Sequence, residues 1–90
     1  MRYPILQSPV ADQAPAADWL TDYDRNHLAL YVRLLDAETD GADWMEVALV
    51  VLDIDPVREP GRARGAWESH LARAKWMTAR GYRHLLAAVH

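Results

Sequence analysis

The sequence predicts a small all-α domain of about four helices, an extended-turn variant of the helix-turn-helix with an N-terminal arm. Apolar residues recur at the three- and four-residue spacing of a helix over most of the chain. The single β-branched run has no second run with which it could form a sheet. With 90 residues, of which 51% are hydrophobic and 26% charged, the chain has room for one domain with a modest core.

Residues 1–18 are predicted to form an extended or disordered arm, and residues 19–90 the helix-turn-helix-like domain. Pro4, Pro9 and Pro15 are spread through the arm, and each fixes its own φ and favours an extended residue before it. The arm also carries apolar side chains that can lie along a groove of the domain: Tyr3, Ile5, Leu6 and Val10.

The first helix is predicted from Asp22 to about Glu38. Thr21 is its N-cap, because a threonine hydroxyl can accept a backbone hydrogen bond, and acidic residues in the first turn suit the positive end of the helix dipole. Leu30 and Leu34 widen the apolar arc of this helix beyond what one core contact needs. The core stripe itself is predicted from helical spacing to consist of Leu28, Tyr31, Val32 and Leu35.

A short second helix is predicted over residues 44–52, after a break at Asp40-Gly41. Asp43 is its N-cap, and Glu46 three positions later completes a pattern like that of a capping box. The following residues are apolar all round and β-branched, so a buried strand is the alternative. We favour the helix because an isolated strand would leave its backbone groups unpaired.

A long turn is expected over residues 53–61, with Pro60 at the first position of a third helix that runs to about Arg80. Gly65 weakens this helix by up to about 1 kcal/mol relative to alanine. Gly81 suits the position after the helix end, and Tyr82 to Val89 can form a closing helix.

Charge is divided unevenly along the chain. Residues 1–55 carry a net charge of −8 and residues 56–90 a net charge of +5, for a total of −3. The cationic cluster of the third helix is either a solvated face or a DNA-contacting surface. In the second interpretation the candidate DNA contacts are Arg58, Arg62, Arg64 and Arg73. The overall negative charge opposes this interpretation, because it repels nucleic acid at long range.

Two tryptophans of the third helix lie nine positions apart, and helical geometry places them on opposite sides. Trp67 shares a predicted core stripe with Ala63, His70, Leu71 and Ala74. Trp76 lies between Arg73 and Arg80 in the sequence. It either packs under the closing helix or anchors an interface, since tryptophan and arginine are favoured at binding hot spots.

We find no sequence pattern for catalysis, a metal or a cofactor. The chain has no cysteine, its four histidines form no ligand motif, and neighbours such as Ser69 and His70 diverge on a helix. No apolar stretch is long enough to span a membrane, and we expect neither export nor insertion. The chain is therefore predicted to be a cytoplasmic macromolecule-binding domain and no enzyme.

Four segments carry a resemblance to a known family, namely LTDYDRNHL (20–28), GADWMEVA (41–48), IDP (54–56) and AWESHLARAKWM (66–77). From residue 20 to about residue 84 the chain resembles an extended-turn helix-turn-helix family of proteobacterial mobile elements, formerly a domain of unknown function. Two positions depart from the family pattern: Asp53 stands where glycine is common, and Gly65 where alanine or arginine is usual. Both departures weaken the DNA interpretation.

The resemblance implies one of two roles. Some members are DNA-binding halves of activators of conjugative transfer, and others are stand-alone antiactivators with acidic surfaces. Because the chain is short and negatively charged, we expect an antiactivator that sequesters an activator by mimicking its internal domain partner. It would thereby repress excision and conjugative transfer of an integrative conjugative element. The predicted partner-binding patch consists of Tyr23, Asp24, His27, Leu30, Leu34 and Glu38.

The predicted partner is the N-terminal domain of a transcriptional activator, and a quorum-sensing regulator is a second candidate. DNA is not expected to be a ligand, nor is a membrane, and the chain is expected to be a monomer or a weak homodimer. The rival hypotheses are a DNA-binding helix-turn-helix regulator and an excisionase-like factor that bends its site.

Overall fold

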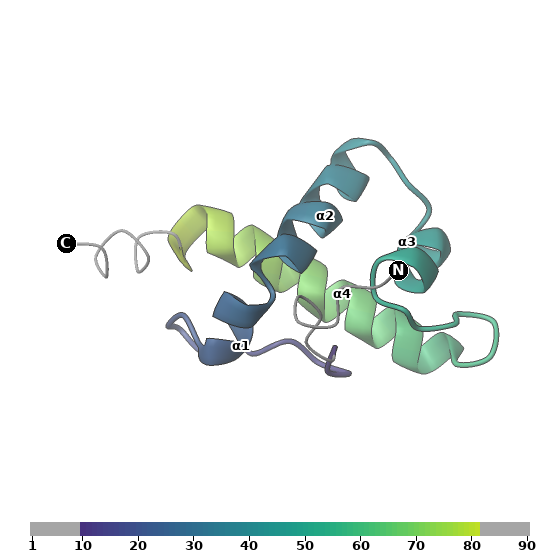
Figure 1. Cartoon of the computed structure of the whole chain (residues 1–90), viewed down its shortest axis with the longest axis horizontal. Coiled ribbons are helices and arrows are strands. Elements are labelled where there is room, and N and C mark those ends of the chain that lie inside the picture. Colours follow the sequence, from purple (N-terminus) through teal and green to yellow (C-terminus); the bar gives the residue numbers. More distant parts are fainter. Residues whose placement is uncertain (1–9, 82–90) are drawn as a thin grey trace, which may run out of the picture.

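The computed structural model describes residues 10–81, and within this range its regular elements are all helical (Figure 1). The elements are α1 (Asp22–Asn26), α2 (Leu28–Thr39), α3 (Trp44–Val50), α4 (Pro60–Trp76) and a π-helical turn, η2 (Met77–Gly81). Both α2 and α3 pack against α4, which forms the long axis of the molecule. The predicted all-α class is confirmed, and the predicted closing helix over residues 82–89 lies outside the described residues.

The first predicted helix is divided at His27, and the prediction of one continuous helix is wrong there. His27 has φ −124° and ψ 23°, and its backbone N–H donates to the carbonyl of Asp24 three residues earlier. Its ring nitrogen Nδ1 lies 2.6 Å from the carbonyl oxygen of Tyr23, which an uninterrupted helix would join to the His27 backbone. The imidazole therefore replaces the backbone as the partner of that carbonyl.

Thr21 is the N-cap of α1, as predicted. Its hydroxyl accepts a hydrogen bond from the Asp24 backbone N–H at 3.2 Å, and the Asp24 carboxylate accepts one from the Thr21 N–H at 2.9 Å. The two residues thus satisfy two unpaired N–H groups at the start of the helix.

The buried line along α2 differs from the predicted stripe. Tyr31 and Leu34 are buried, whereas the side chains of Leu28 and Val32 are 38% and 56% exposed. The buried positions of α1 and α2 continue through the break at three- and four-residue steps, and this line faces α4. They are Asp24, His27, Tyr31 and Leu34. The rest of the described core comes from the residue before Thr21, from α3 and the turn after it, and from α4 and η2. Its members are Leu20, Val47, Ala48, Leu52, Ile54, Ala63, Ala66, Leu71, Ala74 and Met77.

The segment predicted as either helix or strand is the helix α3. Asp43 caps it by accepting a hydrogen bond from the Met45 backbone N–H at 3.1 Å. The chain then turns through Asp53, a non-glycine residue with φ 60°. Pro60 occupies the first turn of α4, as predicted from its fixed φ.

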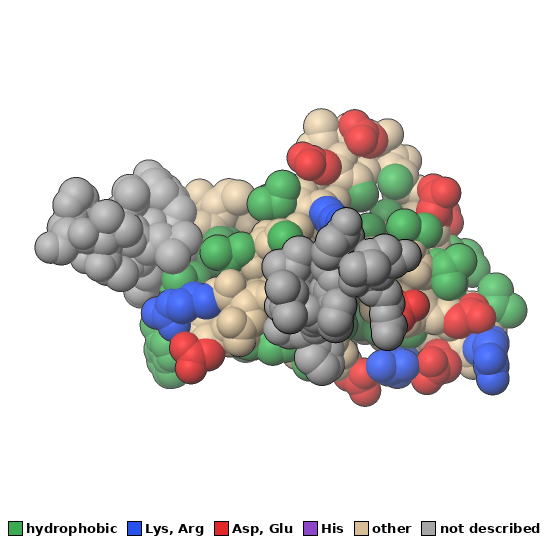
Figure 2. Space-filling model, viewed as in Figure 1, with side chains coloured by type: hydrophobic (Ala, Val, Ile, Leu, Met, Phe, Trp, Pro, Cys, Tyr) green, Lys and Arg blue, Asp and Glu red, His purple; other side chains and the backbone are tan. Residues whose placement is uncertain are grey.

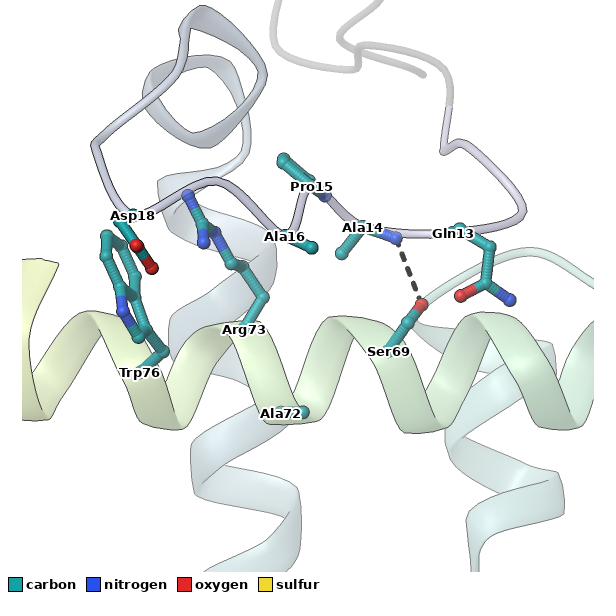
Figure 3. A pocket seen from close by; sticks show the side chains of 9 residues that line it. All are labelled: Gln13, Ala14, Pro15, Ala16, Asp18, Ser69, Ala72, Arg73 and Trp76. Atoms are coloured by element: carbon teal, nitrogen blue, oxygen red, sulfur yellow. Dashed lines mark hydrogen bonds between the residues drawn. The ribbon is translucent and has the colours of Figure 1, made fainter.

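The described part of the arm packs along α4. Val10 lies against the core, and the Ala14 backbone N–H donates to the Ser69 hydroxyl at 3.0 Å (Figure 3). The Asp12 carboxylate accepts a hydrogen bond from Arg62 Nε at 2.7 Å. Residues 10–20 are therefore an ordered part of the fold without helical structure of their own.

Candidate functional site

Three of the four predicted DNA contacts have exposed side chains: Arg58 lies in the turn before α4, and Arg62 and Arg64 lie in the first turns of α4. Arg62 pairs with Asp12 and, at 3.0 Å, with Glu59, and Arg64 Nε donates to Glu68 at 3.0 Å. The Arg58 side chain makes no ion pair with any residue between 10 and 81. Because exposed ion pairs contribute only about 0 to 1 kcal/mol, these arginines can exchange carboxylates for phosphates at little cost.

Arg64 also lies against two indole rings that are in contact with each other. Its guanidinium carbon is 4.9 Å from the centroid of the Trp44 ring and 4.9 Å from that of Trp67. The two rings are 6.0 Å apart and inclined at 41°. Trp67 packs against the core, as predicted from its stripe, so the side chain of Arg64 is supported by both α3 and α4.

The fourth predicted DNA contact, Arg73, is buried. Its guanidinium donates to both carboxylate oxygens of Asp24, at 3.0 and 2.7 Å, and to the backbone carbonyls of Ala17 (2.6 Å) and Trp19 (2.8 Å). The Tyr31 hydroxyl donates to the same carboxylate at 2.7 Å. Arg73 therefore binds the arm and α1 to α4, and it offers no surface to a nucleic acid in this conformation.

The ion pair sets the charge state of Asp24. Burial alone would raise the pKa of this carboxyl group, but the hydrogen bonds from Arg73, Thr21 and Tyr31 outweigh burial and lower the pKa to about 2. Burial and the neighbouring carboxylate raise the pKa of the Tyr31 hydroxyl. Asp24 is thus ionised and Tyr31 protonated across the physiological range.

A second buried chain of hydrogen bonds runs through Tyr23 and His70. The Tyr23 hydroxyl accepts from the Ala11 backbone N–H at 3.0 Å and lies 2.6 Å from His70 Nε2, to which it donates because the proton of the neutral ring is on Nδ1. His70 Nδ1 in turn donates to the Ala66 carbonyl at 2.7 Å. Burial lowers the pKa of His70, so its ring is neutral near pH 7. Both ring nitrogens of His70 are engaged in these hydrogen bonds, so His70 is not available as a base for the neighbouring Ser69.

The six residues of the predicted partner-binding patch do not form one exposed face. Asp24, His27 and Leu34 are buried, and Tyr23 and Leu30 are partly buried. The sixth residue is exposed, and its carboxylate pairs with a lysine of α4: Glu38 with Lys75 at 2.7 Å. Exposed apolar side chains lie on α2 at Leu28 and Val32 and on α3 at Met45, Leu49 and Val50. The all-round apolar pattern of α3 did not distinguish its exposed positions from its buried ones.

A groove of about 310 Å³ separates the arm from α4 (Figure 3). The arm residues 13–16 and 18 line one side, and α4 lines the other. Trp76 lies at one end, with its ring centroid 3.9 Å from the Arg73 guanidinium carbon. Trp76 therefore packs over the guanidinium of Arg73, the cation of the buried ion pair.

The short α3, the extended turn and the long α4 with arginines at its start form a domain of the helix-turn-helix-like class. Residues 5–87 match the family model RovC DNA-bd, described as "T6SS, Transcription factor, DNA binding domain". The chain belongs to this family, which places it among domains of transcription regulators. No curated protein matches the chain. Between residues 10 and 81, every helix is too short or too polar to cross a membrane.

Proposed function

We propose that the chain is a DNA-binding transcription-regulatory domain that inserts the amino-terminal end of α4 into the major groove. The observation that carries the proposal is the grouping of Arg58, Arg62 and Arg64 at this end, in a family of transcription-factor DNA-binding domains. In helix-turn-helix proteins, residues at the start of the second helix contact base edges. The start of α4 also lacks a side-chain cap, so its N–H groups are available to a phosphate.

Arg58 and Arg62 are assigned to phosphates. Arg62 reaches two carboxylates that a phosphate can replace, because its side chain is 41% exposed. On approach of DNA, Asp12 and Glu59 lose their partner and phosphate oxygens gain it, so charge-assisted hydrogen bonds are exchanged and not lost.

The test is a titration of a fluorescent duplex that carries the regulated promoter, at low and near-physiological salt. Arg58→Ala and Arg62→Ala should each weaken binding on all sequences and reduce the salt slope by about 1. Arg33→Ala, which removes an exposed arginine of α2, is the matched control and should change little. An equal effect at Arg33, or no salt-sensitive binding, would contradict the proposal.

A second candidate function is that of an antiactivator, and the charge of the described residues favours it. Residues 10–81 hold thirteen acidic and eight basic side chains, and acids pair with Arg62, Arg64, Arg73 and Lys75. On the face shown in Figure 2, acidic side chains gather around the carboxyl end of α2, and along the lower edge they alternate with basic ones. Such a surface suits a basic protein partner better than DNA.

As an antiactivator, the chain would occupy the N-terminal domain of a cognate activator in the cytoplasm, as a monomer or weak homodimer. It would thereby repress excision and conjugative transfer of an integrative conjugative element, with a quorum-sensing regulator as a further candidate partner. Titration against that isolated domain distinguishes the candidates: binding to the domain without salt-sensitive DNA binding supports the antiactivator. A bend in the bound duplex would instead favour the excisionase-like alternative.

A further inference from the structure

The start of α4 carries arginines in two different states. Arg58 and Arg62 contact no aromatic ring among residues 10–81, whereas the Arg64 guanidinium lies over the rings of both Trp44 and Trp67, at 4.9 Å from each centroid. An arginine that packs on no ring loses rotamer freedom when it binds, whereas an arginine stacked on a ring has already lost much of this freedom. The structure thus prepares one of the three side chains for directional hydrogen bonding.

We propose that Arg64 is the specificity-determining residue of the domain and recognises a guanine, and that Trp44 and Trp67 are its positioning residues. The assignment rests on the DNA binding proposed above. Guanine presents two acceptors in the major groove, O6 and N7, and the fork of an arginine guanidinium matches both. A lysine ammonium can reach the same two acceptors, but as a flexible point charge without the planar fork.

Within residues 10–81, no hydrogen bond occupies the edge of the Arg64 guanidinium that a guanine would contact. Its Nε–H donates to Glu68 at 3.0 Å, and within residues 10–81 its terminal amino groups have no partner. Those two groups form the end-on fork. The Arg64 and Glu68 side chains are 47% and 57% exposed, so a base edge can reach the fork while the Nε–H stays paired.

The same cluster can also be explained as a purely structural clamp between α3 and α4. In that case substitution of Arg64 or Trp44 would change stability and affinity equally for all sequences. Only a change in discrimination between bases separates the two explanations.

The experiment uses the full chain and a bound duplex in which single guanines are replaced by 7-deazaguanine, which lacks the N7 acceptor. For the wild type, one such replacement should weaken binding about tenfold or more. Arg64→Ala, which removes the fork, should bind more weakly and bind both duplexes equally. Arg62→Ala should bind more weakly but keep the tenfold ratio.

Trp44→Leu tests the positioning role. We expect this variant to remain folded by circular dichroism and to lose most of the tenfold ratio while its salt slope stays unchanged. In the absence of DNA, the Arg64 Nε–H resonance should show the ring-current shift and the restricted motion of a stacked group, and it should lose both in this variant.

The outcomes distinguish the two proposals. If the wild type binds no duplex, both the proposed function and the role of Arg64 are wrong. If it binds and Arg64→Ala keeps the discrimination, or no guanine is sensitive to the replacement, only the assignment to Arg64 is overturned. The same holds if Trp44→Leu remains folded and keeps the full ratio.

Discussion

The ion pair between Asp24 and Arg73 connects more parts of the chain than any other pair of described side chains. It joins α1 to α4 directly and holds the arm through two backbone carbonyls. The sequence did not predict it, because the partners are 49 positions apart and helical periodicity reports only local neighbours. Asp24 was predicted at a partner-binding surface and Arg73 at a DNA-binding surface, and each neutralises the other in the interior.

The pH dependence of stability should reveal this ion pair. The pKa of Asp24 falls from 3.8 to about 2 in the folded protein, so between these values the unfolded chain binds more protons. The contribution of Asp24 to the free energy of unfolding is therefore fully present above about pH 5. It should fall by about 2 kcal/mol as the pH drops to 2. Urea denaturation at a series of pH values measures this fall.

Tyr31→Phe provides the control for that measurement. It removes the hydrogen bond from the Tyr31 hydroxyl to Asp24 and should move the acid transition to higher pH. An unchanged acid transition in this variant would show that other carboxyl groups cause the loss.

Asp53 has a left-handed backbone conformation, at a position where glycine is common in the family that the chain resembles. Because the Asp53 side chain is exposed and its φ is 60°, its replacement by glycine removes little packing and relieves the backbone. Asp53→Gly should raise stability by about 0.5 to 1 kcal/mol, which corresponds to a rise in Tm of several degrees. Gly41→Ala is the control and should lower Tm, since Gly41 already has φ 73°.

At the level of elements, the sequence predicted helix starts better than helix continuity. Thr21, Asp43 and Pro60 were found from capping and proline chemistry, which depends on one or two residues. The break at His27 was missed, since apolar spacing continues through it and the ring that replaces the backbone hydrogen bond leaves no pattern.

The arm directly restrains an arginine side chain at the start of α4. Its Asp12 holds Arg62 Nε at 2.7 Å. If α4 contacts DNA, Asp12→Asn should increase affinity a few-fold at low salt, because the phosphate no longer competes with a carboxylate. Asp36→Asn on α2 removes an exposed acid of the same kind and should have a smaller effect. Equal effects in a titration would mean that only net charge matters.

On the scale of the whole molecule, a net charge of −3 and a small arginine cluster predict weak, salt-sensitive DNA binding. With two phosphate contacts, the logarithm of affinity should fall with the logarithm of salt at a slope of about −2, or roughly tenfold between about 50 and 200 mM. Fluorescence titration at four salt concentrations gives this slope. A slope near zero would exclude phosphate contacts and favour a protein partner.

The buried ion pair also has a consequence for how the helices find their alignment. Shifting α4 by one turn against α1 would bury Asp24 without a cation, which costs several kcal/mol, whereas the small core residues Ala63, Ala66 and Ala74 would tolerate the shift. The small apolar residues of α4 therefore discriminate weakly between registers, and the ion pair selects among them together with the hydrogen bond from Tyr23 to His70. We expect a chain that lacks this pair to collapse into helices of similar content without a unique alignment.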